Sequence, residues 1–109
     1  MNQERRQKRI SIICPVYNEE DAIPIFYKRL LEVIGPLRKR YDFELIFTNN
    51  CSTDNSLEII RGYCQKDSMV NVLTLSRNFG HQKSVLAGLT HARGDGIVVI
   101  DVDCEDPPE

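Results

Sequence analysis

Four short apolar runs, each followed by a polar segment, divide the chain into a regular alternation. The runs are rich in β-branched residues, which is typical of strands. They lie at residues 9–16, 43–50, 71–76 and 97–100. A near-continuous apolar run indicates a strand that is covered on both faces. We therefore expect the first strand, and also the fourth, to be buried.

Between these runs, apolar residues recur with a period close to the 3.6 residues of a helix. The three helical stretches lie at residues 23–37, 57–63 and 81–92. Gly35 and Pro36 are expected to end or bend the first helix. In the third helix, Val85, Leu86 and Leu89 are expected to face the core.

The order strand, helix, strand, helix, strand, helix, strand is typical of right-handed crossover units on a parallel sheet. We therefore predict an α/β fold, a Rossmann-like three-layer sandwich with a mostly parallel four-stranded sheet. Residues 1–8 are interpreted as a basic lead-in and residues 9–109 as a single domain. Ligands of such sheets bind beyond the carboxyl ends of the strands. The segments that follow these ends are 15–19, 48–54, 76–80 and 101–109.

Composition narrows the class of protein. The chain is 41% hydrophobic and 28% charged, as in a soluble globular domain, and its net charge of −2 argues against a nucleic-acid partner. It shows neither a signal peptide nor an apolar run near the ~18 residues that span a bilayer, so we expect a cytoplasmic protein. The cysteines form no CxxC pair, which indicates reduced thiols. They are Cys14, Cys51, Cys64 and Cys104.

Acidic residues follow the fourth apolar run directly. Asp101 and Asp103 lie two apart on an extended segment, so their side chains point the same way, and Glu105 continues that register. Such hard oxygen donors suit Mg²⁺ or Mn²⁺, which also bind substrate phosphates. A DxD triplet alone is more typical of a solvated acidic turn. The strand that leads into it favours a metal site.

Other sites of α/β proteins fit less well. There is no GxGxxG after the first strand and no GxxxxGK[ST], which disfavours a dehydrogenase and excludes a P-loop. A phospho-acceptor receiver domain needs acids after its first strand, where this chain has residues 15–17, Pro-Val-Tyr. A zinc site is conceivable at the same edge of the sheet, but its spacing matches no zinc motif. Its ligands would be Cys14, Cys51, Cys104 and His81.

Four segments together carry a resemblance to a known family. They read PVYNEE, NNCSTDNS, LSRNFGHQKSVLAGLTHARGD and DVDCEDPPE. In this order they resemble family 2 glycosyltransferases, most closely the branch that transfers a sugar to dolichyl or undecaprenyl phosphate. The resemblance covers Ile10 to Glu109 and implies the N-terminal half of a GT-A fold. It also implies a UDP- or GDP-hexose donor, a polyprenyl phosphate acceptor and inverting displacement.

The resemblance assigns the nucleoside pocket to the first two strand ends. Pro15, Tyr17 and Glu19 would line it, with Tyr17 near the base and Glu19 near the ribose. Asn50 stands where the family often has an Asp that accepts a hydrogen bond from the base. The family's usual DDGS is NNCS here, so Asn49 also replaces an acid. An Asn can both accept and donate, which leaves the base open.

The resemblance places the diphosphate and the metal at the later strand ends. Asp101 and Asp103 would meet the divalent cation and the donor diphosphate or ribose. Glu105, at a position that is commonly Gln, would join the metal site and add negative charge to it. Arg77 and Asn78 would lie beside the donor pocket.

In the family, the acceptor-binding half and the candidate catalytic base follow DPPE, and in the polyprenyl branch a membrane-anchoring C-terminal region does too. We therefore expect a nucleotide-sugar-binding portion that is inactive alone, with its base beyond Glu109. Membrane association would come only through that missing region, at the cytoplasmic face. Uncovered sheet edges indicate a possible homo-oligomer. The alternative, favoured by NNCS, is a non-catalytic nucleotide-binding or interaction module that keeps the fold.

Overall fold

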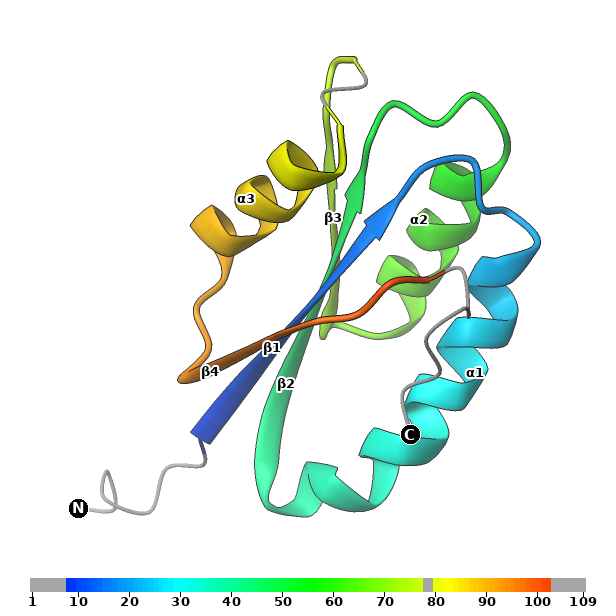
Figure 1. The fold of residues 1–109 in the computed structure, drawn as a ribbon. Helices are drawn as coiled ribbons and strands as arrows, with labels where there is room; N and C mark the ends of the chain where they lie inside the picture. Colours follow the sequence, from blue (N-terminus) through cyan, green and yellow to red (C-terminus); the bar gives the residue numbers. More distant parts are fainter. Residues whose placement is uncertain (1–7, 78–79, 103–109) are drawn as a thin grey trace.

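The computed structural model describes residues 8–77 and 80–102. Within these ranges strands and helices alternate in the predicted order (Figure 1). The elements are β1 (Lys8–Val16), α1 (Ala22–Ile34), η2 (Gly35–Lys39), β2 (Tyr41–Asn49), α2 (Ser56–Lys66), β3 (Val70–Thr74), α3 (His81–His91) and β4 (Gly96–Val99). The bend predicted at Gly35 is confirmed, because the 3₁₀ helix η2 continues α1 from that residue. No helix of the described ranges is long and apolar enough to cross a bilayer.

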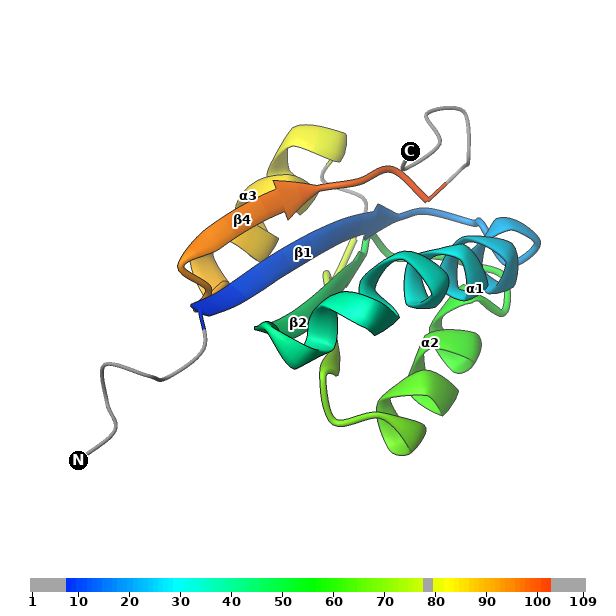
Figure 2. The same cartoon turned by 90° about the horizontal axis from the view of Figure 1, so that it is seen from below.

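The strands form one parallel sheet in the order β3-β2-β1-β4. Helices α1 and α2 cover one face, while α3 covers the opposite face (Figures 1 and 2). The predicted α/β sandwich with three layers and a parallel four-stranded sheet is therefore confirmed. Because every strand runs in the same direction, all four carboxyl ends lie at one edge of the sheet.

The main core lies between the sheet and the helices α1 and α2. Helix α1 contributes apolar side chains at the spacing of three and four residues that places them on one face. These side chains are Ile23, Phe26, Leu30 and Ile34. Phe26 meets Phe47 of β2 edge to face, with ring centroids 6.5 Å apart. The predicted burial of the first strand is confirmed, since β1 is buried from Ser11 to Val16.

Helix α3 packs on the sheet through small residues. A Cβ on Gly88 would lie 2.6 Å from Cγ2 of Ile13, so only glycine allows this approach. One turn earlier, the hydroxyl oxygens of Ser84 and Thr48 lie 2.7 Å apart in the buried interface. The inward face predicted for α3 was therefore wrong at two positions. Leu86 and Leu89 are 59% and 40% exposed, because the small-residue stripe occupies the side of the helix that meets the sheet.

Strand β4 differs from the prediction that it is buried. Ile97, Val98 and Val99 are 45%, 46% and 43% exposed. In the described part of the chain, β4 pairs with β1 alone and forms an edge of the sheet. An apolar run specifies a strand but not its place in the sheet, and here the run forms an uncovered edge.

The segment ARGD before β4 anchors that strand to the start of the sheet. The backbone N–H of Arg93 and the hydroxyl of Ser11 both donate to Oε2 of Glu44, at 2.5 Å each. The N–H of Gly94 donates to Oγ of Ser11 at 2.8 Å. One carboxylate on β2 thus joins the end of the α3 connection to β1. The ARGD segment therefore has a structural role at the edge opposite the carboxyl ends.

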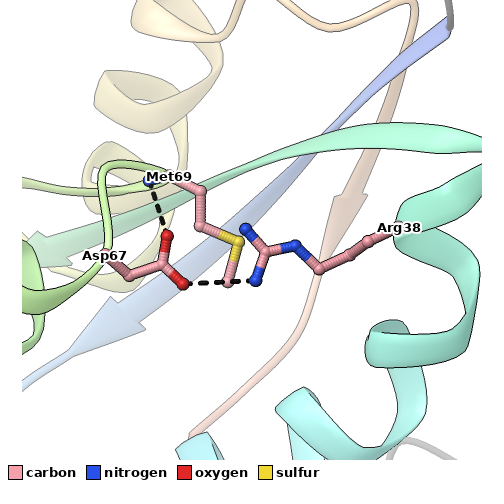
Figure 3. A network of polar contacts seen from close by, with 3 residues as sticks. All are labelled: Arg38, Asp67 and Met69. Atoms are coloured by element: carbon pink, nitrogen blue, oxygen red, sulfur yellow. Dashed lines mark hydrogen bonds and ion pairs between the residues drawn. The ribbon is translucent and has the colours of Figure 1, made fainter.

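A second polar contact closes the same end of the molecule (Figure 3). Nη1 of Arg38 in η2 lies 3.3 Å from Oδ2 of Asp67, which follows α2. The other carboxylate oxygen of Asp67 accepts from the backbone N–H of Met69 at 3.1 Å. Since Arg38 is exposed, the ion pair adds little stability. The backbone N–H groups of Met69 and Val70, which both donate to Asp67, hold the turn into β3.

Candidate functional site

The polar segments that follow the strands meet at the carboxyl edge of the sheet. Val16 of β1 is in register with Asn49 of β2. The backbone N–H of Asn50 donates to the carbonyl of Val16 at 2.8 Å, and that of Leu75 donates to the carbonyl of Asn49 at 2.9 Å. The loops after β1, β2 and β3 therefore leave the sheet side by side. This is the edge at which the sequence predicts a ligand.

The loop after β1 carries three of the predicted nucleoside residues. Pro15 is buried within β1, whereas Tyr17 is exposed at the start of the loop. Oε1 of Glu19 accepts from the backbone N–H of Tyr17 at 3.2 Å. Asn18, between them, has a φ of 51°, in the left-handed region. The reversal at Asn18 brings the Glu19 carboxylate back to the tyrosine, so both lie on one short loop.

Two buried asparagines mark the junction between β2 and the loop that follows it, Asn49 as the last residue of the strand and Asn50 as the first of the loop. Oδ1 of Asn49 accepts from the backbone N–H of Ser52 at 3.2 Å, which closes a side-chain turn over Cys51. Cys51 has a φ of 60°, a conformation that favours glycine. The family pattern has glycine at this position. An aspartate could accept the Ser52 bond equally well, so Asn49 keeps the turn although the acid is gone.

The two loops are hydrogen bonded to each other. Three consecutive backbone N–H groups of the first loop each donate to a side chain of the second. The bonds run from Asn18 to Oγ of Ser52 at 3.0 Å, from Glu19 to Oγ of Ser56 at 2.9 Å and from Glu20 to Oδ2 of Asp54 at 3.1 Å. These side chains satisfy N–H groups at the entry to α1 that would otherwise need water.

These contacts change the pKa of Asp54. Its second oxygen, Oδ1, accepts from the backbone N–H of Ser56 at 2.9 Å. Burial by itself raises the pKa of Asp54, but the hydrogen bonds from Ser56 and from the Glu20 backbone lower it by more. The net effect is a lowered pKa, because hydrogen bonds to a carboxylate favour its ionised form.

Asp101 lies at the same edge, beyond the end of β4. The backbone N–H of Ile100 donates to the carbonyl of Ile13 at 2.9 Å, so the β4 chain still follows β1 at this level. Burial, and then the charge of Asp101, raise the pKa of the Cys14 thiol. The carboxylate is therefore near the carboxyl end of β1. Cys14 is fully buried in the apolar core, as is typical of a cysteine that packs as a small hydrophobic residue.

Of the other residues predicted to bind the metal and the diphosphate, only Arg77 is among the residues that the structure describes. Asp103, Glu105 and Asn78 lie outside the described residues. Arg77 is exposed just after β3. Within residues 8–77 and 80–102, no three metal-ligating side chains gather. Among the described carboxylates at this edge, Asp101 is the one that the sequence analysis assigns to a hard cation.

The residues whose side chains bind the loop after β1 to the segment after β2 were not predicted from the sequence. Ser52, Thr53, Asp54 and Ser56 hold the first loop in place, although in the sequence the segment 51–54 indicates only side chains that can cap the following helix. Their partners lie more than thirty positions away in the chain. Only the parallel pairing of β1 with β2 brings the two loops together.

Comparison with known proteins identifies a family whose model matches most of the chain. The sequence model described as "Glycosyl transferase family 2" matches residues 11–109. The chain is 46% identical over 101 residues to the "Prophage bactoprenol glucosyl transferase homolog" of Escherichia coli (strain K12), covering 93% of this chain and 32% of that protein. The chain thus spans about a third of the length of this relative.

Solved structures share the fold. The mannosyltransferase PcManGT from Pyrobaculum calidifontis, in complex with GDP-Man and Mn²⁺, superposes with a TM-score of 0.76 at 23% identity, covering 90% of this chain and 28% of that one. The structure of S. aureus TarS 1-349 in complex with UDP gives a TM-score of 0.75 at 30% identity, covering 87% of this chain and 27% of that one.

Proposed function

Because the chain belongs to glycosyl transferase family 2, we propose that it is the donor-binding portion of an enzyme that transfers a hexose from UDP- or GDP-sugar to polyprenyl phosphate. The observation that carries the proposal is the convergence of the loops after β1 and β2 with Asp101 at one edge of the sheet. The bactoprenol relative supports the acceptor. The GDP-Man and UDP complexes of the structural neighbours support the donor.

The loop residues have roles that follow from where they lie. Exposed Tyr17 offers a ring on which a base can stack, and Glu19 lies beside it for the ribose. Asn50, buried at the end of β2, supplies an amide for the base edge. The acceptor would displace the nucleotide at the anomeric carbon, so the donor sugar and the product would have opposite anomeric configurations. The catalytic base would lie beyond Glu109.

The proposed metal site is the segment from Asp101 to Glu105. Asp101, Asp103 and Glu105 would hold Mg²⁺ or Mn²⁺ through carboxylate oxygens, the donors these ions prefer. When bound, such a cation neutralises charge on a leaving diphosphate. Within the described part of the chain, Asp101 fits this role, because its carboxylate emerges at the edge where the diphosphate would lie.

The location of the parent enzyme follows from the same proposal. A transferase that uses a nucleotide sugar and a polyprenyl phosphate works where a soluble donor meets a lipid acceptor. We place it at the cytoplasmic face of the membrane.

Titration calorimetry of the 109-residue chain with UDP and GDP, with and without Mn²⁺, tests the donor site. We expect one of the two nucleotides to bind, at least tenfold more tightly with Mn²⁺, and the Mn²⁺ effect to disappear in Asp101→Asn. A nucleotide affinity that changes neither with Mn²⁺ nor in Asp101→Asn would favour the non-catalytic module instead. A folded chain that binds neither nucleotide contradicts the proposed donor site and favours the interaction module.

A further inference from the structure

The bonds between the two site loops run in both directions. Besides the three N–H groups that the first loop donates, two N–H groups of the second loop donate back. Thr53 donates to Oδ1 of Asn18 at 2.7 Å, and Asn55 donates to Oε1 of Glu20 at 3.4 Å. Each loop thus uses side chains to satisfy the backbone of the other. We call this set of bonds the loop latch.

Asn18 is the centre of the loop latch. Its Oδ1 also accepts from the hydroxyl of Thr53 at 3.3 Å, and its own N–H donates to Ser52 at 3.0 Å. Its φ of 51° turns the chain so that side chain and backbone both face the second loop. The position therefore needs a residue that tolerates the left-handed region and carries a short acceptor. Asn and Asp meet both requirements.

We propose that Asn18 is a positioning residue of the donor site. It holds the loop that carries Tyr17 and Glu19 against the loop that carries Asn50, so that groups from two strands face one nucleotide. The inference rests on the proposed function. Its physical basis is that a loop fixed before binding need not be ordered by the ligand, which leaves more of the contact energy as affinity.

Two substitutions separate the latch from the backbone turn. Asn18→Gly adopts a positive φ freely but removes the acceptor, whereas Asn18→Asp keeps both. We expect Asn18→Gly to bind the preferred nucleotide, UDP or GDP, about tenfold more weakly by calorimetry, a loss of about 1.4 kcal/mol. Asn18→Asp should stay within about threefold of the parent chain. Asn71→Ala, which removes an exposed asparagine of β3 outside the latch, is the matched control and should leave affinity unchanged.

Amide hydrogen exchange provides a readout that does not depend on nucleotide. In Asn18→Gly, the Thr53 amide should exchange about tenfold faster, because its acceptor is lost. The Met69 amide, which donates to Asp67 at the opposite edge of the sheet, serves as an internal reference outside the latch. Circular dichroism confirms that each variant is folded.

The outcomes distinguish this inference from the function on which it rests. If Asn18→Gly binds nucleotide as tightly as the parent, Asn18 does not position the donor site and the inference is overturned. Unchanged exchange at Thr53 in that variant overturns the latch itself, whether or not nucleotide binds. A folded parent chain that binds neither UDP nor GDP contradicts the proposed function, while the Thr53 result still decides whether the latch exists.

Discussion

Cys51 holds a backbone conformation that suits glycine. Its φ of 60° places Cβ close to the following carbonyl, which costs a residue other than glycine about 1–2 kcal/mol. The turn is fixed by the bond from Ser52 to Asn49, so the chain cannot relax without losing that bond. The site loop therefore stores strain at the residue where the family pattern has glycine.

Replacing Cys51 by glycine should release that strain. We expect Cys51→Gly to raise the free energy of unfolding by about 1 kcal/mol in urea denaturation, the strain being offset in part by the greater entropy of an unfolded glycine. Cys51→Ala is the control, since it removes the thiol but keeps Cβ. Equal stability of the two variants would show that the strain at this residue is no larger than the entropic cost of glycine.

Asp54 makes the loop latch sensitive to acid. Its folded pKa is lowered by hydrogen bonds from Ser56 and Glu20, so the folded chain binds its proton less tightly than the unfolded chain does. The stabilisation is therefore complete above the unfolded pKa of about 3.9 and is lost as the pH falls through the lower folded value. Acid should loosen the latch before it unfolds the core.

The Asp54→Asn variant tests this dependence. At pH 6 the parent chain should have the larger free energy of unfolding. The difference between the two should shrink below about pH 4, where Asp54 of the unfolded chain begins to gain its proton before that of the folded chain does. Urea titrations of both chains at pH 6 and pH 3 measure it. A difference that stays constant over this range would mean that the hydrogen bonds do not favour the ionised form.

At the scale of elements, Gly94 determines how α3 connects to β4. A Cβ there would lie 2.5 Å from Oγ and 2.7 Å from the backbone nitrogen of Ser11, and 2.9 Å from the carbonyl oxygen of Arg9. Two of these atoms belong to the β1 backbone and cannot move without disturbing the sheet. The connection therefore passes over β1 at a distance that only glycine allows.

Gly94→Ala should consequently destabilise the fold. We expect a loss of about 2–3 kcal/mol in the free energy of unfolding, as for overpacking in a rigid site. Gly62→Ala is the matched control, because Gly62 lies within α2 with open space around it. Alanine there should add about 1 kcal/mol through helix propensity. Similar effects of the two substitutions in thermal denaturation would contradict the close approach at Gly94.

The elements were predictable because their signals are local. Period and β-branched content gave all four strands and three helices, and the parallel arrangement then gave the edge at which the loops meet. The orientation of α3 was not predictable in this way. Leu86 and Leu89 had the hydrophobicity of a core face, but Ser84 and Gly88 were the residues small enough to let the helix approach Ile13.

In the candidate site, too, some features were predictable from the sequence and others were not. Pro15, Tyr17, Glu19 and Asn50 were placed at the carboxyl edge by the order of the strands, and Asp101 by the run that precedes it. The loop latch was missed, because its bonds join residues about 35 positions apart and depend on a left-handed turn at Asn18. Side-chain pairing between distant loops has no periodic signature in a sequence.

At the scale of the whole molecule, the edge strand β4 carries exposed apolar side chains on both faces of the sheet. Ile97 and Val99 are in register with Ser11 and Ile13, which face α3, whereas Val98 is in register with Ile12 on the opposite face. All three β4 side chains are more than two-fifths exposed. Both faces of this edge strand are thus apolar, and its outer side, which pairs with no strand among residues 8–77 and 80–102, can accept another strand.

We expect a second copy of the chain to cover this edge, as the sequence led us to predict. Two β4 strands related by a twofold axis would pair antiparallel and bury these side chains together. Light scattering after size exclusion should then give twice the chain mass of 12.5 kDa at high concentration. Val98→Lys, which places a charge on the edge, should shift the chain to monomer. Ile25→Lys, at an exposed position of α1, should not. A parent chain that stays monomeric, or an equal effect of both lysines, would exclude pairing through β4.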